Sequence, residues 1–192
     1  MMQGRHSRCS GPATGVHVHD QRGIKMKVRA QSIKVRPVRW HPFPVEHMPD
    51  RYKQPAAAPA LASCPICHAV FMRGRWQWRS IPPGAATLVC SACQRISDKM
   101  PAGRVRLDGA FEATHRAEML ALVRHREGQL RAQHPMERVM AIDSGEQGTE
   151  VTTTGLHLAR DIGNAIHHAY RGTLTIDYGN AETELDVRWH RE

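Results

Sequence analysis

Short alternations of apolar and polar residues run through the middle of the chain, from residue 61 to residue 107. Successive side chains of a strand point to opposite faces, so this alternation predicts β-strands. The expected strands are 69–72, 76–79, 86–89 and 104–107, with a turn at Ile81-Pro82-Pro83-Gly84.

Apolar positions take a helical spacing over residues 110–133. We expect Asp108 to cap the start of this helix, and His134 to end it because it precedes a proline. The loose apolar stripe on one face consists of Phe111, Met119, Leu122, Val123 and Leu130.

The last part of the chain, residues 136–192, predicts a compact ββαββ unit. Its expected elements are strands at 138–142 and 150–154, a helix at 156–170, and strands at 173–178 and 184–189. Thr153 or Thr154 is the expected cap of that helix. Glu137 and Arg138, at the start of the first of these strands, are expected to make surface ion pairs.

Residues 1–60 have no sustained periodicity and are rich in Gly, Pro, His and basic side chains, which predicts a disordered tail and linker. The chain is therefore expected to be an α+β protein in four parts. These are the tail (1–60), a ribbon (61–107), a connecting helix (108–135) and an α+β domain (136–192).

Two cysteine pairs stand within the ribbon segment. Cys64 and Cys67 form one C-x-x-C pair, Cys90 and Cys93 form another, and 22 residues separate them. Each pair can present two thiolates from one tight turn, so that together they can surround one ion tetrahedrally. Strands and a turn between two such pairs are typical of a zinc ribbon, and we predict one structural Zn²⁺.

Other uses of the four cysteines stay open at this point. Disulfides or unrelated thiols are alternatives, and iron in a rubredoxin-like site is the rival metal. His68, directly after the first pair, is expected to be a neighbour of the sulfurs rather than a fifth ligand. A closed four-thiolate site has no open coordination position, so it implies no catalysis.

Charge is distributed unevenly along the chain. Residues 1–63 contain 11 Lys and Arg against 3 Asp and Glu, whereas residues 111–192 contain 9 against 13. The whole chain has a formal net charge of +9. The basic part is therefore expected to meet a polyanion, although a positive tail can also serve solubility alone.

Basic and aromatic residues alternate around the predicted ribbon hairpin. Nucleic acids are bound by cations for the phosphates and by flat rings for the bases. The candidate contacts there are Arg73, Arg75, Trp76, Trp78 and Arg79. The two tryptophans could equally fill the small core of the ribbon.

A second basic stripe lies on the polar face of the last predicted helix. Arg160 and Arg171 are its candidate phosphate contacts. A charged helix face of this kind is more often simply solvated.

Signatures of common enzymes are missing from the sequence. We find no P-loop, no G-x-S-x-G and no H-E-x-x-H, so we expect a binding protein rather than an enzyme. No apolar run is long enough for a transmembrane helix, and no secretory signal is present. A cytoplasmic location, with reduced thiols and no membrane partner, is therefore expected.

Several segments together carry a family resemblance. They are Cys64–Phe71, Gly74–Trp78, Cys90–Asp98, Pro101–Gly103, His134–Arg138 and Thr152–Arg160. Over about residues 50–190 the chain resembles a bacterial zinc-ribbon family, described among low-oxygen-activated proteobacterial proteins and sometimes labelled ATPase. His68 replaces an expected glycine, and residues 1–48 look like an extension. The ribbon is also weakly similar to the N-terminal zinc ribbons of the export adaptor that binds the large ribosomal subunit.

The resemblance implies a cytoplasmic zinc protein and transfers no activity; the sequence has no Walker motif to support the ATPase label. Our first hypothesis is a non-enzymatic zinc-ribbon protein that binds RNA or the ribosome, in a stress or low-oxygen response. The second is a protein-interaction adaptor or regulator, with a purely structural zinc and a partner bound through residues 136–192. The third is a rubredoxin-like electron carrier.

Overall fold

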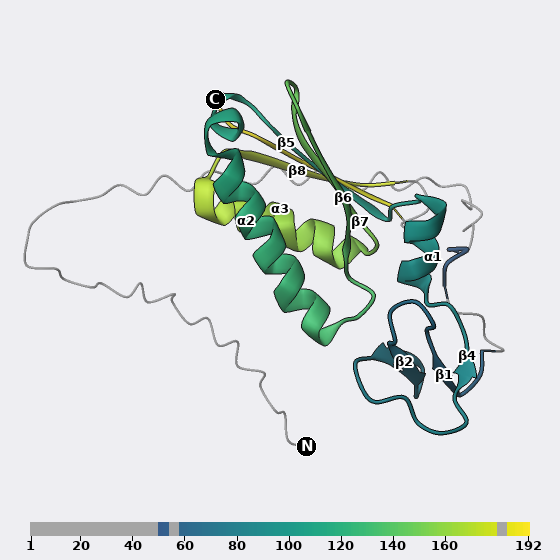
Figure 1. The fold of residues 1–192 in the computed structure, drawn as a ribbon. Coiled ribbons are helices and arrows are strands. Elements are labelled where there is room, and N and C mark those ends of the chain that lie inside the picture. Colours follow the sequence, from purple (N-terminus) through teal and green to yellow (C-terminus); the bar gives the residue numbers. More distant parts are fainter. Residues whose placement is uncertain (1–49, 54–57, 180–183) are drawn as a thin grey trace, which may run out of the picture. The chain divides into compact units, whose positions relative to one another are not determined.

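The computed structural model describes residues 50–53, 58–179 and 184–192. The tail predicted to be disordered, residues 1–60, lies outside these ranges except for 50–53 and 58–60. The described strands form two sheets, with the orders β3-β2-β1-β4 and β6-β7-β5-β9-β8 (Figure 1). Helix α1 follows the strands of the smaller sheet, and helices α2 and α3 lie between strands of the larger one. This arrangement confirms the α+β class.

The smaller sheet consists of short strands around the first cysteine pair. Its strands are β1 (Leu61–Ser63), β2 (Val70–Met72), β3 (Arg75–Gln77) and β4 (Ala86–Thr87). β2 pairs antiparallel with β1 and β3, and β4 pairs parallel with β1. Strand β1 was not predicted, because three residues are too few to show an alternation.

A short helix, α1 (Ser91–Asp98), begins directly after Cys90 and contains Cys93; it was not predicted from the sequence. Arg95 of α1 donates to both carboxylate oxygens of Asp50, at 2.8 and 2.9 Å, and lies 4.3 Å from the centre of the Tyr52 ring. Residues 50–53, at the end of the stretch predicted to be disordered, are instead held against α1. We call residues 61–98 the ribbon.

The larger sheet and its two helices form what we call the sheet unit, residues 103–192. The strands are β5 (Gly103–Asp108), β6 (Val139–Gly145), β7 (Gly148–Thr153), β8 (Thr173–Tyr178) and β9 (Leu185–His190). The helices are α2 (Ala110–Gln133) and α3 (Leu156–Tyr170). The predicted order of two strands, a helix and two strands after residue 136 is confirmed.

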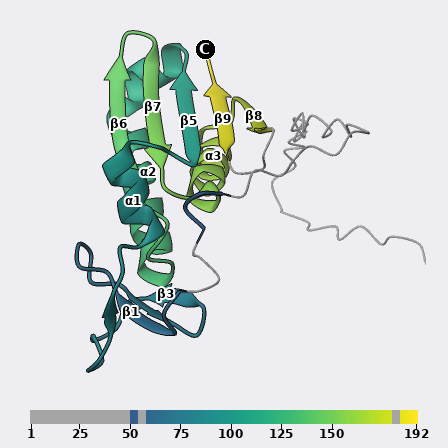
Figure 2. The ribbon, with the colours of Figure 1, turned by 90° about the vertical axis from the view of Figure 1, so that its right-hand side faces the viewer.

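Strand β5 corrects the expectation that residues 104–107 extend the ribbon. It lies in the middle of the five-stranded sheet, antiparallel to β7 and parallel to β9 (Figure 2). Val105 and Leu107 are buried, whereas Arg104 and Arg106 are exposed on the other face. The alternation of a strand predicts its two faces but not its partners, so this distant pairing could not be predicted from the local pattern.

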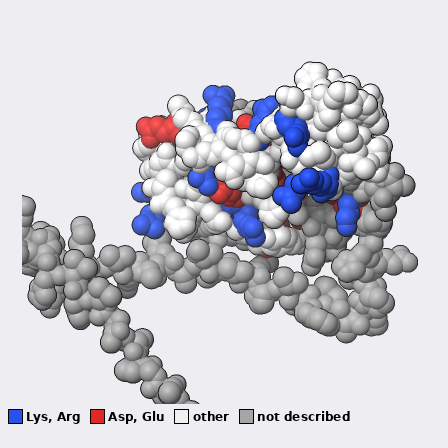
Figure 3. Space-filling view, turned by 90° about the horizontal axis from the view of Figure 1, so that it is seen from below, with Lys and Arg blue, Asp and Glu red and all other residues white. Residues whose placement is uncertain are grey.

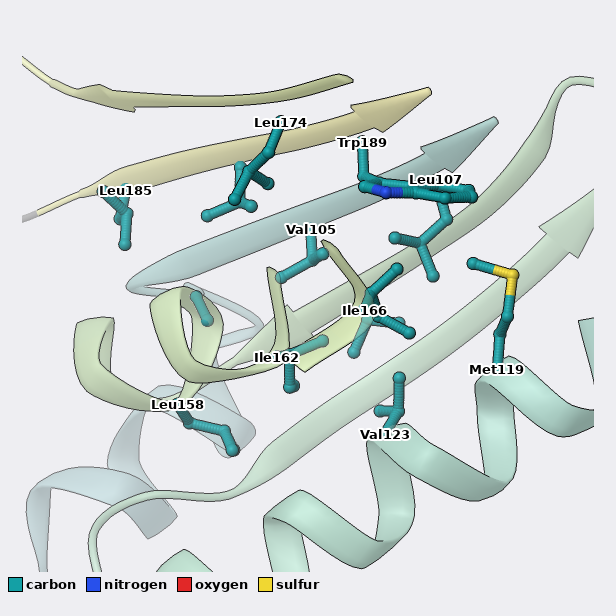
Figure 4. Packing of buried hydrophobic residues seen from close by; sticks show 13 residues of the cluster. Val105, Leu107, Met119, Val123, Leu158, Ile162, Ile166, Leu174, Leu185 and Trp189 are labelled. Atoms are coloured by element: carbon teal, nitrogen blue, oxygen red, sulfur yellow. The ribbon is translucent and has the colours of Figure 1, made fainter. Parts of the chain in front are cut away.

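Both long helices pack on one face of this sheet, and an apolar core fills the space between (Figure 4). α2 therefore does more than connect two domains, because Met119 and Val123 contribute to that core. The other labelled residues of the core are Val105, Leu107, Leu158, Ile162, Ile166, Leu174, Leu185 and Trp189.

The helix starts differ from the predicted caps. Gly109, not Asp108, is the N-cap of α2, with φ 103° and its Cα packed so closely on Arg191 that a Cβ would lie 2.1 Å from the Arg191 carbonyl oxygen. Gly155, not Thr153 or Thr154, is the N-cap of α3. Neither glycine has a side chain to accept a hydrogen bond, so other residues must satisfy the first helical N–H groups.

Candidate metal centre

The four predicted cysteine ligands come together in the ribbon. The Sγ atoms of Cys64, Cys67, Cys90 and Cys93 all lie within 4.8 Å of one another. The thiols are free, and the Sγ atoms of Cys67 and Cys90 are 3.7 Å apart. This cluster could hold a metal ion, and sulfur atoms at such distances fit the corners of a tetrahedral site.

The first pair lies on a tight turn that leads into β2. The His68 N–H donates to the Cys64 carbonyl at 2.9 Å, and the Cys64 N–H donates to the Ala69 carbonyl at 2.9 Å. His68 has a φ of 63°, in the left-handed region that favours glycine. This explains why a glycine is expected here, and the exposed His68 is not part of the sulfur cluster.

The second pair lies at the start of α1. Cys90 is the N-cap residue, and its Sγ accepts a hydrogen bond from the Cys93 N–H at 3.5 Å. The Cys90 N–H in turn donates to the Cys64 Sγ, also at 3.5 Å. Backbone donors and the positive end of the helix both favour thiolates at this position.

The thiols differ in acidity because of their surroundings. Burial raises the pKa of Cys90 and the pKa of Cys93. Burial opposes ionisation of Cys64 as well, but hydrogen bonds from the backbone N–H groups of Cys90, Cys67 and Ile66 lower its pKa to about 7. Several thiolates this close repel one another unless a cation lies between them, so the donor set suits a divalent ion.

Arg138, which follows α2, completes the surroundings of the cluster. Its Nη2 donates to the Cys67 Sγ at 3.0 Å, and its Nη1 donates to the Cys93 Sγ at 3.4 Å. A longer contact of 4.0 Å joins Nη2 to the Cys90 Sγ. Burial would lower the pKa of Arg138, but its hydrogen bonds to Cys67 and Cys93 and the charge of the thiolates raise it.

The expected surface ion pairs of Glu137 and Arg138 are therefore wrong. The two side chains are only 9% and 6% exposed, and Arg138 reaches sulfurs more than 40 residues away in the sequence. No local spacing could have revealed that contact. The one available signal was the His134–Arg138 segment, which the family resemblance had included without a role.

The predicted nucleic-acid contacts of the ribbon fall into two groups. Arg73, Arg75 and Arg79 are exposed at or next to the β2–β3 hairpin, whereas Trp76 is only 8% exposed and packs on Phe71 with ring centres 5.3 Å apart. Trp76 thus belongs to the ribbon core. On the face drawn in Figure 3, Lys and Arg side chains are spread more widely than acidic ones.

Trp78 occupies an intermediate position. Its side chain is 38% exposed, and its indole N–H donates to the Arg131 carbonyl at 2.6 Å. The guanidinium groups of Arg131 and Arg138 lie 5.9 and 5.7 Å from its ring centre. The indole N–H of Trp78 is therefore bonded within the protein, while part of its ring remains exposed to solvent.

The two predicted contacts on α3 are also exposed. Arg160 lies in the helix, and Arg171 is its C-cap residue with a φ of 61°. The basic residues predicted from the sequence thus belong to two different elements, α3 and the β2–β3 hairpin.

No helix in the described part of the chain has the length and apolar content needed to cross a bilayer. Comparisons with protein-family models, with curated proteins and with solved structures find no match. The family resemblance consequently stays a prediction.

Proposed function

We propose that the protein is a non-enzymatic zinc-ribbon protein that binds RNA, either free or in the ribosome, through the β2–β3 hairpin of the ribbon. The exposed arginines of that hairpin, which have no acidic partner among the described residues, are the observation that carries the proposal. The proposed role of the metal is structural, and that of the hairpin is contact with phosphates.

Zinc is the metal that suits the four sulfurs best. A donor set of four cysteines is closed, which is the arrangement of structural zinc rather than of catalytic zinc. Iron is the alternative for a four-thiolate site and would make the protein an electron carrier. A ferric site of this kind is red, whereas a zinc site is colourless, so an absorbance spectrum distinguishes them.

The hairpin supports the proposed RNA contact by its charge. Within the described residues, no acidic side chain lies within ion-pair distance of Arg73, Arg75 or Arg79. Arg73 and Gly74 have φ values of 53° and 79°, which place a tight turn between the strands. Arg73 and Arg75 flank this exposed turn, and Arg79 follows β3, where its Nη1 donates to the Met72 Sδ at 3.7 Å. None of the three has an acidic partner among the described residues, so their charge is available to phosphates.

Trp78 supplies the second kind of contact that RNA requires. Its partly open ring follows directly on β3, between Gln77 and Arg79, and could stack on an unpaired base. The buried Trp76 supports the ribbon from within instead. Arg160 and Arg171 remain proposed phosphate contacts, with exposure as their support.

The proposal is tested by fluorescence anisotropy with labelled single-stranded RNA, using the metal-loaded protein at several salt concentrations. The variant R73A/R75A/R79A should reduce the slope of log affinity against log salt by about 2, because each phosphate contact adds about 0.7. The matched control R104A/R124A/R188A removes three exposed arginines that also lack an acidic partner within the described residues. Equal losses in both variants, or no binding near physiological salt, would contradict RNA recognition by the hairpin.

A protein-interaction adaptor is the second candidate, and the sheet unit provides the observation that favours it. The sheet face opposite α2 and α3 exposes charges of both signs, among them Arg104, Arg106 and Arg188 with Glu150 and Asp186 nearby. No described element covers this face. Failure of RNA binding in the same titration would favour a protein partner for residues 136–192.

A further inference from the structure

Two segments that are far apart in the sequence lie against each other beside the metal centre. One is Met136–Arg138, between α2 and β6, and the other is Thr154–Leu158, at the start of α3. The Thr154 hydroxyl donates to the Met136 carbonyl at 2.6 Å and accepts from the Arg138 N–H at 2.9 Å. The Thr154 N–H donates to the Arg138 carbonyl at 2.9 Å. The two segments are thus fixed to each other through their backbones.

Arg138 extends from this junction into the ribbon. Its Nε donates to the Pro135 carbonyl at 2.7 Å, which fixes the plane of the guanidinium. The two Nη atoms are then directed at the Cys67 and Cys93 sulfurs. Met136 also reaches the ribbon, where its Sδ accepts from the Ser91 hydroxyl at 3.3 Å.

Glu137 extends in a different direction, to the start of α3. Its Oε2 accepts from the Leu158 N–H at 2.9 Å, one of the N–H groups that Gly155 cannot satisfy. A Cβ on Gly155 would lie 2.2 Å from the same oxygen, so the missing side chain is what makes room for the carboxylate. Glu137 therefore replaces the absent N-cap side chain of α3.

We propose that Arg138 is a positioning residue of the metal centre, and that Met136–Arg138 links metal binding to the docking of the ribbon and to the capping of α3. The proposal rests on zinc as the bound ion. A divalent ion with four thiolates carries two negative charges, and the buried guanidinium offsets part of them. Arg138 can contact Cys67, Cys90 and Cys93 together only while these sulfurs lie close to one another. A bound ion would hold them at that distance.

This coupling has to act in both directions. If zinc stabilises the docked arrangement through Arg138, then loss of Arg138 must weaken zinc binding by the same factor. Residues that hydrogen-bond to metal ligands commonly contribute about 10–100-fold to metal affinity. The start of α3 should then loosen when zinc is removed, although it has no ligand of its own.

The test uses R138M, which preserves most of the side-chain volume but removes the donors. Zinc transfer from the full-length protein to a chromogenic chelator is followed by absorbance, with R104M as a matched exposed control. We expect R138M to lose zinc at least about tenfold more readily than the wild type, and R104M to behave as the wild type. R138K should fall between them, because an ammonium cannot hold the forked contacts to two sulfurs.

Hydrogen exchange provides the readout for the coupling itself. Zinc removal from the wild type should reduce protection of the Leu158 amide, while the Ile166 amide in the middle of α3 remains protected. R138M with zinc bound should show the same local loss at Leu158. If R138M does not fold, R138K and T154V, which removes the hydroxyl that holds Arg138, carry the same test.

Equal zinc loss from R138M and the wild type would overturn the proposal. Unchanged protection of Leu158 after zinc removal would do so as well. If either result is obtained while the wild-type protein binds zinc, only the proposed role of Arg138 and its segment is contradicted. A wild-type protein that binds no zinc would contradict both this inference and the proposed function.

Discussion

The ribbon and the sheet unit differ in what their interiors contain. The buried apolar residues of the ribbon include few large side chains, namely Val70, Phe71 and Trp76; the others are alanines and cysteines. The sheet unit buries a continuous core between one sheet face and two helices, including Trp189 and four residues of α3. Apolar burial can therefore account for the sheet unit, whereas the ribbon needs its sulfur cluster.

We expect the largest effect from removal of the metal, which should unfold the ribbon and leave the sheet unit folded. Structural zinc contributes about 10–16 kcal/mol in small finger peptides, more than a core as small as that of the ribbon can supply. We expect a chelator to remove amide protection from β1 and β2 and to change the near-ultraviolet circular dichroism of Trp76 and Trp78. Val105 and Ile166 should keep their protection, and added zinc should restore the ribbon. Persistent protection of β1 without metal would contradict this division.

A core substitution should act on the other region. Ile162→Ala removes a side chain that is fully buried in the sheet unit, which costs about 2–5 kcal/mol. Ile96→Ala, at a position 41% exposed in α1, is the matched control and should cost far less. Chemical denaturation followed by far-ultraviolet circular dichroism measures both, with zinc content unchanged. Similar costs in the two variants would mean that the sheet unit does not depend on this core.

In both regions the sequence predicted the local features but not the contacts between distant residues. The cysteine ligands follow from spacing alone, because C-x-x-C pairs are a local chemical pattern. The order of elements after residue 136 follows from alternation and helical periodicity, which are also local. The sheet partner of β5 and the contact of Arg138 with the sulfurs depend on distant parts of the chain meeting, so no local pattern contained them.

The junction at Glu137 offers a smaller effect. In Gly155→Ala the added Cβ would lie within 2.4 Å of both carboxylate oxygens of Glu137, which must move and release the Leu158 N–H. We expect a loss of about 1–3 kcal/mol, as for other overpacked sites. Gly128→Ala is the control, because no atom lies within 4 Å of its Cβ position in α2. Gly128→Ala should be neutral or slightly stabilising. If Gly155→Ala has the same small effect, the contact of Glu137 with the Leu158 N–H is not needed for stability.

The smallest expected effect is a pH dependence. Burial raises the pKa of Glu137 above its ordinary value of 4.5, although the Leu158 N–H and nearby histidines oppose the shift. The folded state therefore binds the proton more tightly, and this contribution to stability is lost as pH rises from 4.5 through the raised pKa. E137Q should remove that part of the slope while preserving an acceptor for Leu158. Denaturation of both proteins across this window measures it, and parallel curves would contradict the assignment.

We propose that one zinc ion, held by Cys64, Cys67, Cys90 and Cys93, organises the ribbon. The most direct measurement is elemental analysis of the purified protein, together with its visible absorbance spectrum. We expect one zinc per chain, no colour, and loss of the metal in the C64S/C90S variant. A chain without metal, or a red protein that contains iron, would contradict it.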